Sequence, residues 1–160
     1  PEILKSVPDA HILMVGQGPY LSHLKKLVEE LNLVDHVSFI GRIQYAQLPQ
    51  YICAGDIFAM PSRSRFFGLE VEGLGIVYLE ASACGLPVIA GSSGGAPDAV
   101  LEGVTGIVVD GENNNEIAAA AIKLLNDLNG AKAMGLAGRE WIIENWRWEI
   151  WSERFNKLLQ

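Results

Sequence analysis

Charged side chains are scarce in this sequence, and positive ones are scarcer than negative ones. Asp, Glu, Lys and Arg make up 19% of the 160 residues, and the formal net charge is −7. Because a dedicated nucleic-acid-binding protein normally carries a basic face, this balance argues against nucleic acid as a partner. The hydrophobic fraction of 49% indicates a well-filled globular core and not a disordered chain.

Long apolar runs and clustered metal ligands are lacking too. No run approaches the roughly 18 apolar residues of a membrane-spanning helix, and the opening "PEILKSVPDA" has no signal-peptide pattern. The histidines, His11, His23 and His36, are scattered, so we expect no metal ion and no other cofactor. Cys53 and Cys84 fit reduced, buried thiols. These features predict a cytoplasmic protein and are compatible with a peripheral position at the inner face of the plasma membrane.

Short apolar runs alternate with helical patterns along the chain. The runs that predict strands are 11–15, 36–40, 56–60, 87–90 and 105–110. Helical spacing of apolar residues predicts helices over 20–31, 44–55, 75–84, 113–128, 131–146 and 147–160, and a short helix follows the loop that begins at 91. The alternation predicts an α/β fold with a Rossmann-like parallel sheet covered by helices on both faces, three layers in all.

Sheets of this kind bind ligands at the carboxyl ends of their strands, in the loops that lead into the helices. Those loops are glycine-rich here, and they are residues 16–19, 41–44, 61–75 and 91–96. We therefore expect the ligand at this edge.

Two carboxylates stand out in "VEGLGIVYLEASACGLPVIA", residues 71–90, which otherwise holds small and apolar residues. The helix predicted from Gly75 has free N–H groups and the positive end of its dipole at its start, which suits a diphosphate. Glu72 just before it would accept hydrogen bonds from sugar hydroxyls, and Glu80 shares a helical stripe with Ile76 and Ala83. A ribose offers Glu80 two adjacent hydroxyls. The alternative is that Glu72 caps the helix and Glu80 is merely exposed.

The segment "EGLGIVYLEASACGLPVIA" resembles the signature of retaining glycosyltransferases of the GT-B fold, family 4, in which two glutamates are separated by seven residues. The segments "ILMVGQGP", "VSFIGRI", "AGDIFAMPSRSR", "SSGGAPDAV" and "TGIVVDG" are similar to parts of that family's donor-binding domain. With "WRWEIWSERF" near the end, the chain is similar to actinobacterial phosphatidylinositol mannosyltransferases, which use GDP-mannose.

This resemblance implies roles for individual residues. Glu72 matches the catalytic-site glutamate that contacts the donor sugar, and Glu80 matches the glutamate that binds ribose. The other donor-binding positions that it implies are Gly73, Leu74, Gly75 and Ile76 at the sugar and diphosphate, Gly41, Arg42 and Ile43 beside the nucleobase, Ser62 and Arg63 after a strand at the ligand edge, and Gly16 at the end of the first strand. Arg42 as an ordinary surface arginine, and residues 62–63 as a solvated loop, are the alternatives.

The resemblance also implies parts that this sequence does not contain. The family's donor domain normally begins with a further strand and a glycine-rich loop, which bears an arginine and a lysine for the diphosphate, and "PEILKSVPDA" reads as the end of the helix that follows. In the strand order 3-2-1-4-5-6 the missing strand would lie in the middle of the sheet and leave a seam. Residues 1–160 are thus interpreted as a donor-binding domain truncated at its N-terminus, without the acceptor-binding domain. We expect poor affinity for the donor and no activity from the chain alone.

The last helices, residues 141–160, would cross back to the missing N-terminal domain. Their tryptophans, Trp141, Trp146, Trp148 and Trp151, either pack in the core or leave an apolar face that supports self-association.

The implied reaction is transfer of a hexose, mannose from GDP-mannose, to a lipid or glycan acceptor with retention at the anomeric carbon. The rival hypotheses are a non-catalytic nucleotide-binding module and a GT-B sugar-nucleotide epimerase. A Rossmann dehydrogenase is disfavoured because "VGQGPY" does not complete the G-x-G-x-x-G pattern.

Overall fold

The structure, a computed structural model, describes residues 1–159. Its strands are β1 (Ile12–Val15), β2 (Val37–Gly41), β3 (Phe58–Met60), β4 (Val88–Gly91) and β5 (Gly106–Val109). Its α-helices are α1 (Glu2–Ser6), α2 (Leu21–Glu30), α3 (Leu48–Ile52), α4 (Ile76–Ala83), α5 (Asn114–Asn126), α6 (Leu128–Asn145) and α7 (Trp148–Leu158). Single 3₁₀ turns lie at η1 (Val34–His36), η2 (Tyr45–Gln47), η3 (Phe66–Gly68) and η4 (Ala96–Ala99).

The predicted strands and helices are confirmed, except that one predicted helix is divided into two shorter elements. The helix predicted over 44–55 consists of η2 followed by α3, and Pro49 lies in the first turn of α3. Proline is tolerated in a first turn because its missing N–H has no helical partner there, whereas it would interrupt a helix interior.

The strands form two separate parallel sheets. β1 pairs with β2, and β4 lies between β3 and β5 in the second sheet. No strand of residues 1–159 joins β1 to β3. The expected seam between two sheets is therefore confirmed, and it lies between β1 and β3, as the order 3-2-1-4-5-6 predicts.

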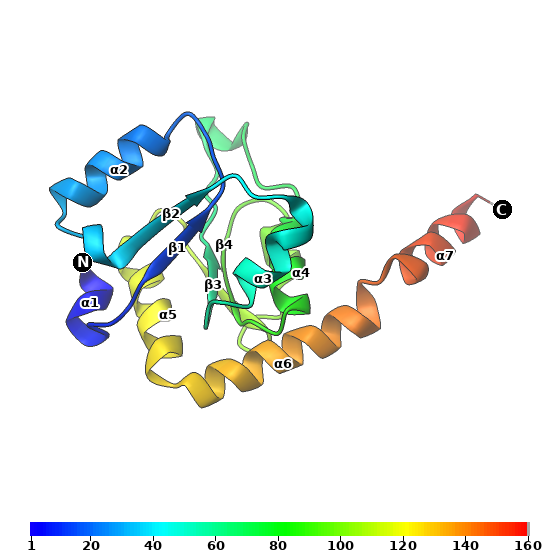
Figure 1. The fold of residues 1–160 in the computed structure, drawn as a ribbon. Helices are drawn as coiled ribbons and strands as arrows, with labels where there is room; N and C mark the ends of the chain where they lie inside the picture. The colour runs from blue at the N-terminus through cyan, green and yellow to red at the C-terminus, as the bar shows by residue number, and fades with distance from the viewer. Residues whose placement is uncertain (160) are drawn as a thin grey trace.

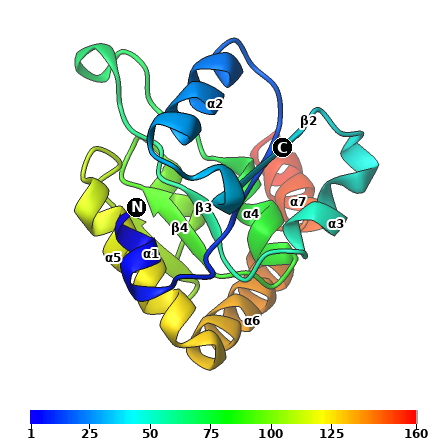
Figure 2. The same cartoon turned by 60° about the vertical axis from the view of Figure 1, so that its left-hand side comes forward.

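The sheet of β3, β4 and β5 is covered on both faces (Figures 1 and 2). Every residue of β4 is buried, because this strand is central and carries only small or branched apolar side chains. On one face Val88 and Ala90 pack with Tyr78 and Ala81 of α4. On the other face Ile89 packs with alanines and Leu124 of α5. The predicted three-layer arrangement is confirmed for this sheet.

The strand predicted at 11–15 is present, but the prediction that it is buried is wrong. All four residues of β1 are exposed, Ile12 to 53%. Within residues 1–159, β1 has a neighbouring strand on one edge only, and its residues belong to neither core cluster. Its apolar side chains therefore meet solvent. α2 lies near this sheet, with the Lys25 ammonium 6.0 Å from the centre of the Phe39 ring in β2.

The C-terminal helices form an arm. α6 packs against α4 and β5, and α7 then continues beyond the rest of the fold (Figure 1). At the joint, the rings of Trp141, Trp146 and Trp151 follow one another with centroids 5.7 and 5.5 Å apart, and the Trp151 indole N–H donates to the Asn145 carbonyl at 2.9 Å. The core alternative for the tryptophans is wrong for Trp148, which is 83% exposed, and for Trp151.

The interpretation of both cysteines as buried thiols is also wrong. Cys53 is exposed and Cys84 is half-buried, because each directly follows the last turn of its helix, α3 or α4. Cys84 packs against the edge of the core beside α4. Both are free thiols. Every helix within the described residues is too short or too polar to span a bilayer.

Candidate functional site

The start of α4 is built on Gly75. This residue precedes the helix with φ of 73°, a left-handed conformation that glycine adopts without strain. A Cβ here would overlap the ring of Tyr78, which is fully buried directly beneath. As a glycine, Gly75 has no side chain with which to cap the N–H groups of the first turn. The first turn of α4 thus presents its backbone N–H groups and the positive end of its dipole at the expected ligand edge.

The loop before α4 is held from below by residues 91–96. The Ser93 hydroxyl accepts from the Glu72 N–H at 3.1 Å, and the Gly95 N–H donates to the Glu72 carbonyl at 3.0 Å. A Cβ at Gly94 or Gly95 would overlap the backbone of Glu72 or Gly73. The segment "SSGG" therefore serves as a backbone cradle for the Glu72 loop, which explains its serine and glycines.

Tyr78 joins the helix to the end of β3. Its hydroxyl donates to the Met60 carbonyl at 2.7 Å and lies 2.9 Å from the Ser62 hydroxyl. Burial is the largest cause that raises the pKa of the Tyr78 phenol above 10, so it remains a neutral donor. The predicted site residue Ser62 is thereby turned to the tyrosine beneath the loop, which is a positioning contact.

Replacing Tyr78 with phenylalanine should lower the free energy of unfolding by about 1–2 kcal/mol, because the buried Met60 carbonyl loses its donor. Since the folded-state pKa of Tyr78 is raised, its contribution is complete below pH 10 and is lost as the pH rises above that value. Urea unfolding at pH 7 and pH 10.5 measures both effects. The exposed Tyr20→Phe change is the matched control, and equal stabilities of the two variants would contradict this role.

Glu72 occupies the loop beside the helix start. Its side chain is half-buried, and Oε1 accepts from the Gly73 N–H at 3.2 Å. This partner precedes α4, and the carboxylate bonds to no N–H group of Ile76–Ala83, so the alternative in which Glu72 caps the helix is wrong. The carboxylate has further lone pairs available at the edge of the site.

Glu80 shares a stripe of α4 with Ile76 and Ala83, as the spacing predicts, and this stripe faces away from the core. Ile76, one turn before it, is 63% exposed, whereas Tyr78, Ala81 and Ser82 face the core. Glu80 is half-buried, and its Oε1 accepts from the Tyr45 hydroxyl at 2.9 Å. The Glu80 carboxylate is therefore held by a hydrogen bond from η2 and is not a free surface group, so the alternative in which Glu80 is merely exposed is wrong.

The predicted base-side residues are gathered at the end of β2. The Gly16 N–H donates to the Gly41 carbonyl at 2.8 Å, and both glycines have positive φ. Beyond them lies an open hollow of about 510 Å³. It is lined by Arg42, Ile43 and Gln44 between β2 and η2, and by Ile40 of β2, Gln47 of η2 and Tyr51 of α3. Arg42 is exposed. The structure thus brings Gly16, Gly41, Arg42 and Ile43 together beside one concavity.

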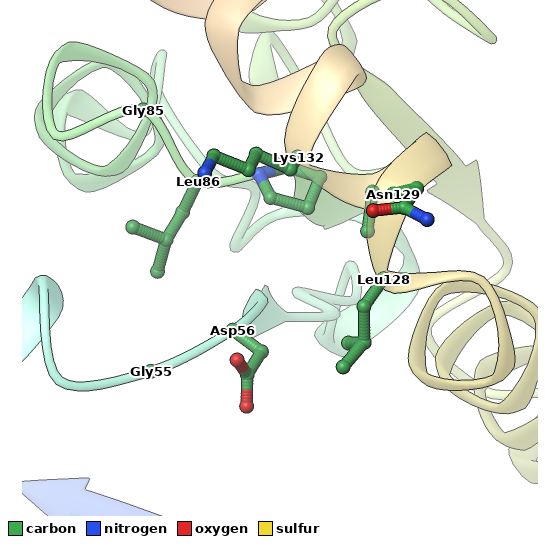
Figure 3. Close-up of a pocket in the computed structure, with 9 residues that line it drawn as sticks. Gly55, Asp56, Gly85, Leu86, Leu128, Asn129 and Lys132 are labelled. Atoms are coloured by element: carbon green, nitrogen blue, oxygen red, sulfur yellow. The ribbon is translucent and has the colours of Figure 1, made fainter.

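The other predicted residues have separate places. Gly73, Leu74, Gly75 and Ile76 form the turn into α4, and Arg63 is exposed in the loop after β3. A second hollow, of about 280 Å³, is lined by Asp56, Leu86, Leu128 and Lys132 among others (Figure 3). Residues 55–56 and 85–87 precede β3 and β4, so this hollow lies at the opposite edge of the sheet and outside the candidate site.

The histidines have local partners. His11 Nε2 lies 2.9 Å from the Ser38 hydroxyl, His36 Nδ1 lies 3.0 Å from the Ala10 carbonyl, and His23 stacks edge-on with Tyr20. Within residues 1–159, no three His, Cys, Asp or Glu side chains come close enough to hold a metal ion.

Sequence reasoning missed three residues of this site: Tyr45, Tyr78 and Ser93. For Tyr78 the sequence does hold a local signal, which is the large aromatic residue three positions after Gly75. Because glycine has no side chain, it leaves room for such a ring. No local pattern identifies Tyr45 or Ser93. The partner of Tyr45, Glu80, lies 35 residues later in the chain, and the partner of Ser93, Glu72, lies 21 residues earlier.

The fold and the candidate site define an α/β protein with parallel strands, a glycine-lined helix start and two carboxylates at the carboxyl ends of its strands. The family "Glycosyl transferases group 1" matches residues 1–141, and the chain belongs to this family. Its fold is that of a Rossmann-like half of a GT-B glycosyltransferase.

Two curated relatives are both described as GDP-mannose-dependent alpha-(1-6)-phosphatidylinositol monomannoside mannosyltransferases. The chain is 50% identical to that of Mycolicibacterium smegmatis over 99% of its own length, and 48% identical to that of Mycobacterium tuberculosis over 100%. It spans 42% of the length of each relative.

Solved structures agree with the fold. Sucrose-phosphate synthase from Thermosynechococcus elongatus superposes with a TM-score of 0.85 at 31% identity, over 98% of this chain and 39% of that one. HepE from Anabaena, solved in complex with UDP, superposes with a TM-score of 0.83 at 23% identity, over 99% and 44%.

Proposed function

We propose that this chain binds the sugar nucleotide in a retaining mannosyltransferase that uses GDP-mannose. The observation that carries the proposal is that Glu72 precedes the start of α4 and Glu80 lies within α4, where it bonds to Tyr45 of η2. The neighbours of Tyr45, Gln44 and Gln47, line the hollow beside Arg42. The 48–50% identity to GDP-mannose-dependent mannosyltransferases supports the choice of base and hexose. An acceptor of phosphatidylinositol mannoside type is supported by the same names.

In this proposal each part of the site holds one part of the donor. The base occupies the hollow beside Gly41, Arg42 and Ile43, with Gly16 fixing the Gly41 backbone. Glu80 accepts from the ribose hydroxyls, since one carboxylate can take two adjacent O–H donors.

The remaining groups serve the reaction itself. The N–H groups of Gly73, Leu74, Gly75 and Ile76 stabilise the leaving diphosphate together with the helix dipole. Glu72 holds the hexose hydroxyls, and Ser62 and Arg63 line the same edge. The bond from the anomeric carbon to the phosphate oxygen breaks as the bond to the acceptor hydroxyl forms on the same face, and the hydroxyl proton passes to the released diphosphate. We propose that no metal ion or other cofactor takes part.

The whole enzyme is proposed to contain a second half that binds the acceptor. The arm of α6 and α7 supports this proposal, because the exposed Trp148, Phe155 and Leu158 leave an apolar surface on α7 that suits packing against another domain. In the chain alone this surface would favour self-association. A lipid acceptor would place the whole enzyme at a membrane surface.

Titration calorimetry of the chain with GDP, GDP-mannose and UDP-glucose, in buffer containing EDTA, tests the proposed donor. We expect both guanine nucleotides to bind more tightly than UDP-glucose, with unchanged affinities when EDTA is replaced by Mg²⁺. A preference for UDP-glucose would overturn the choice of base, and a Mg²⁺-dependent affinity would overturn the metal-free proposal. We expect the affinities themselves to be weak, and absence of binding by the folded chain would show that residues 1–160 do not suffice for the donor site.

A further inference from the structure

A side-chain bond crosses the seam between the two sheets at the candidate site. The Tyr45 hydroxyl donates to Glu80 Oε1 at 2.9 Å, and the two residues are 35 positions apart. Tyr45 lies in η2, directly after β2 of the first sheet, and Glu80 lies in α4, which packs against the second sheet. The bond therefore connects the base side of the site to its carboxylate.

The position of Tyr45 is not accounted for by core packing. The residue is 80% exposed, so its ring gains little from burial. Its backbone is nevertheless fixed, because Gln44 and Gln47 form a reciprocal capping box around η2, with the Gln44 N–H donating to Gln47 Oε1 at 3.2 Å. Tyr45 is thus an exposed aromatic residue on a rigid turn, directed at one carboxylate.

In this pair the Tyr45 hydroxyl is always a hydrogen-bond donor, and the Glu80 carboxylate is an acceptor with positions left for a ligand. The hydrogen bond to Glu80 and then the negative charge of Glu80 raise the pKa of the Tyr45 phenol, which therefore keeps its proton at neutral pH. A carboxylate offers about four acceptor positions, so one bond to Oε1 leaves Oε2 and further lone pairs for a ligand. The phenol restricts the orientation of the carboxylate without filling it.

We propose that Tyr45 is a positioning residue for the sugar nucleotide: it fixes the Glu80 carboxylate in the orientation that accepts from the two ribose hydroxyls. This inference rests on the proposed function, because it assumes that Glu80 meets a ribose. It adds a residue from the other side of the seam to the ribose contact, so that the two halves of the site are assembled together.

The test compares two ligands that differ only in the hydroxyls concerned, GDP and 2′,3′-dideoxy-GDP, by titration calorimetry with the full chain. Tyr45→Phe keeps the ring and removes the donor, and Tyr20→Phe is the matched control for loss of an exposed tyrosine hydroxyl. We expect Tyr45→Phe to weaken GDP binding by about 3- to 10-fold, the range of one net hydrogen bond, and to leave dideoxy-GDP binding unchanged. In a Glu80→Gln background the same change should cause no additional loss.

Three results would overturn the proposal. An equal loss for both ligands would mean that Tyr45 supports the local structure only, and an unchanged GDP affinity would mean that its bond is dispensable. Tighter GDP binding would mean that the phenol competes with the ribose for Glu80. A wild-type chain that binds GDP and its dideoxy analogue equally would instead remove the ribose contact of the proposed function, so the two failures are distinguishable.

Discussion

Replacement of Glu80 by glutamine should weaken GDP binding by about 10- to 100-fold, because hydrogen bonds to a charged carboxylate contribute about 1.5–3 kcal/mol. The amide keeps one acceptor oxygen but replaces the other with a donor, which faces a ribose hydroxyl with the wrong polarity. It also loses the charge that favours the Tyr45 bond. Titration calorimetry with GDP measures the change.

The matched control for this variant is Glu140→Gln. Glu140 is an exposed carboxylate on α6 and belongs to none of the segments that form the candidate site, so its change should leave the affinity for GDP unchanged. Urea unfolding of both variants measures their stability in parallel. Because Glu80 is only half-buried, we expect Glu80→Gln to change the free energy of unfolding little. An affinity for GDP that survives Glu80→Gln would remove Glu80 from the donor site.

Alanine at Gly75 should lower the free energy of unfolding by about 3 kcal/mol, which corresponds to a fall in Tm of about 6–12 °C for a domain of this size. The left-handed backbone costs an L-residue about 1–2 kcal/mol, and the new methyl group overlaps the buried Tyr78 ring. The shift of the loop should also abolish donor binding, because the N–H groups of the first turn move with it.

Gly103 separates the two causes. It has the same φ of 73°, but a Cβ there would meet open space. Gly103→Ala should therefore lower stability only by the backbone cost, about 1–2 kcal/mol, and leave donor binding intact. Thermal unfolding of both variants measures the difference, and equal shifts would show that the Tyr78 ring yields without cost.

The sequence predicted the elements well because their signals are local. The apolar run at 87–90 and the alanine-rich repeat after Asn113 each fix an element within a few residues, and Gly75 marks a helix start. The helical spacing of Ile76, Glu80 and Ala83 predicted their shared stripe on α4 for the same reason. The role of each carboxylate toward a ligand stays a prediction.

What sequence reasoning could not predict depends on contacts between distant segments. The exposure of β1 follows from which strands pair, and the bond between Tyr45 and Glu80 follows from how η2 is placed against α4. Trp148 fits a core helix by composition, but its exposure is decided by where the arm of α6 and α7 leaves the fold. Burial of an apolar residue is thus a property of the assembled layers and not of its own spacing.

The two-sheet arrangement has a consequence for how such a protein can change its substrate. The residues beside the proposed base follow β2 of the first sheet, whereas Glu72 and the turn into α4 belong to the second. In the proposed site, substitutions at residues 41–43 can thus alter the selected nucleobase without disturbing the hydroxyl contacts of the hexose, and changes in residues 69–76 can do the reverse. Donor selectivity would then divide between the two sheets, and Tyr45, whose hydroxyl bonds to Glu80, is the residue that an engineer must keep when one part is exchanged.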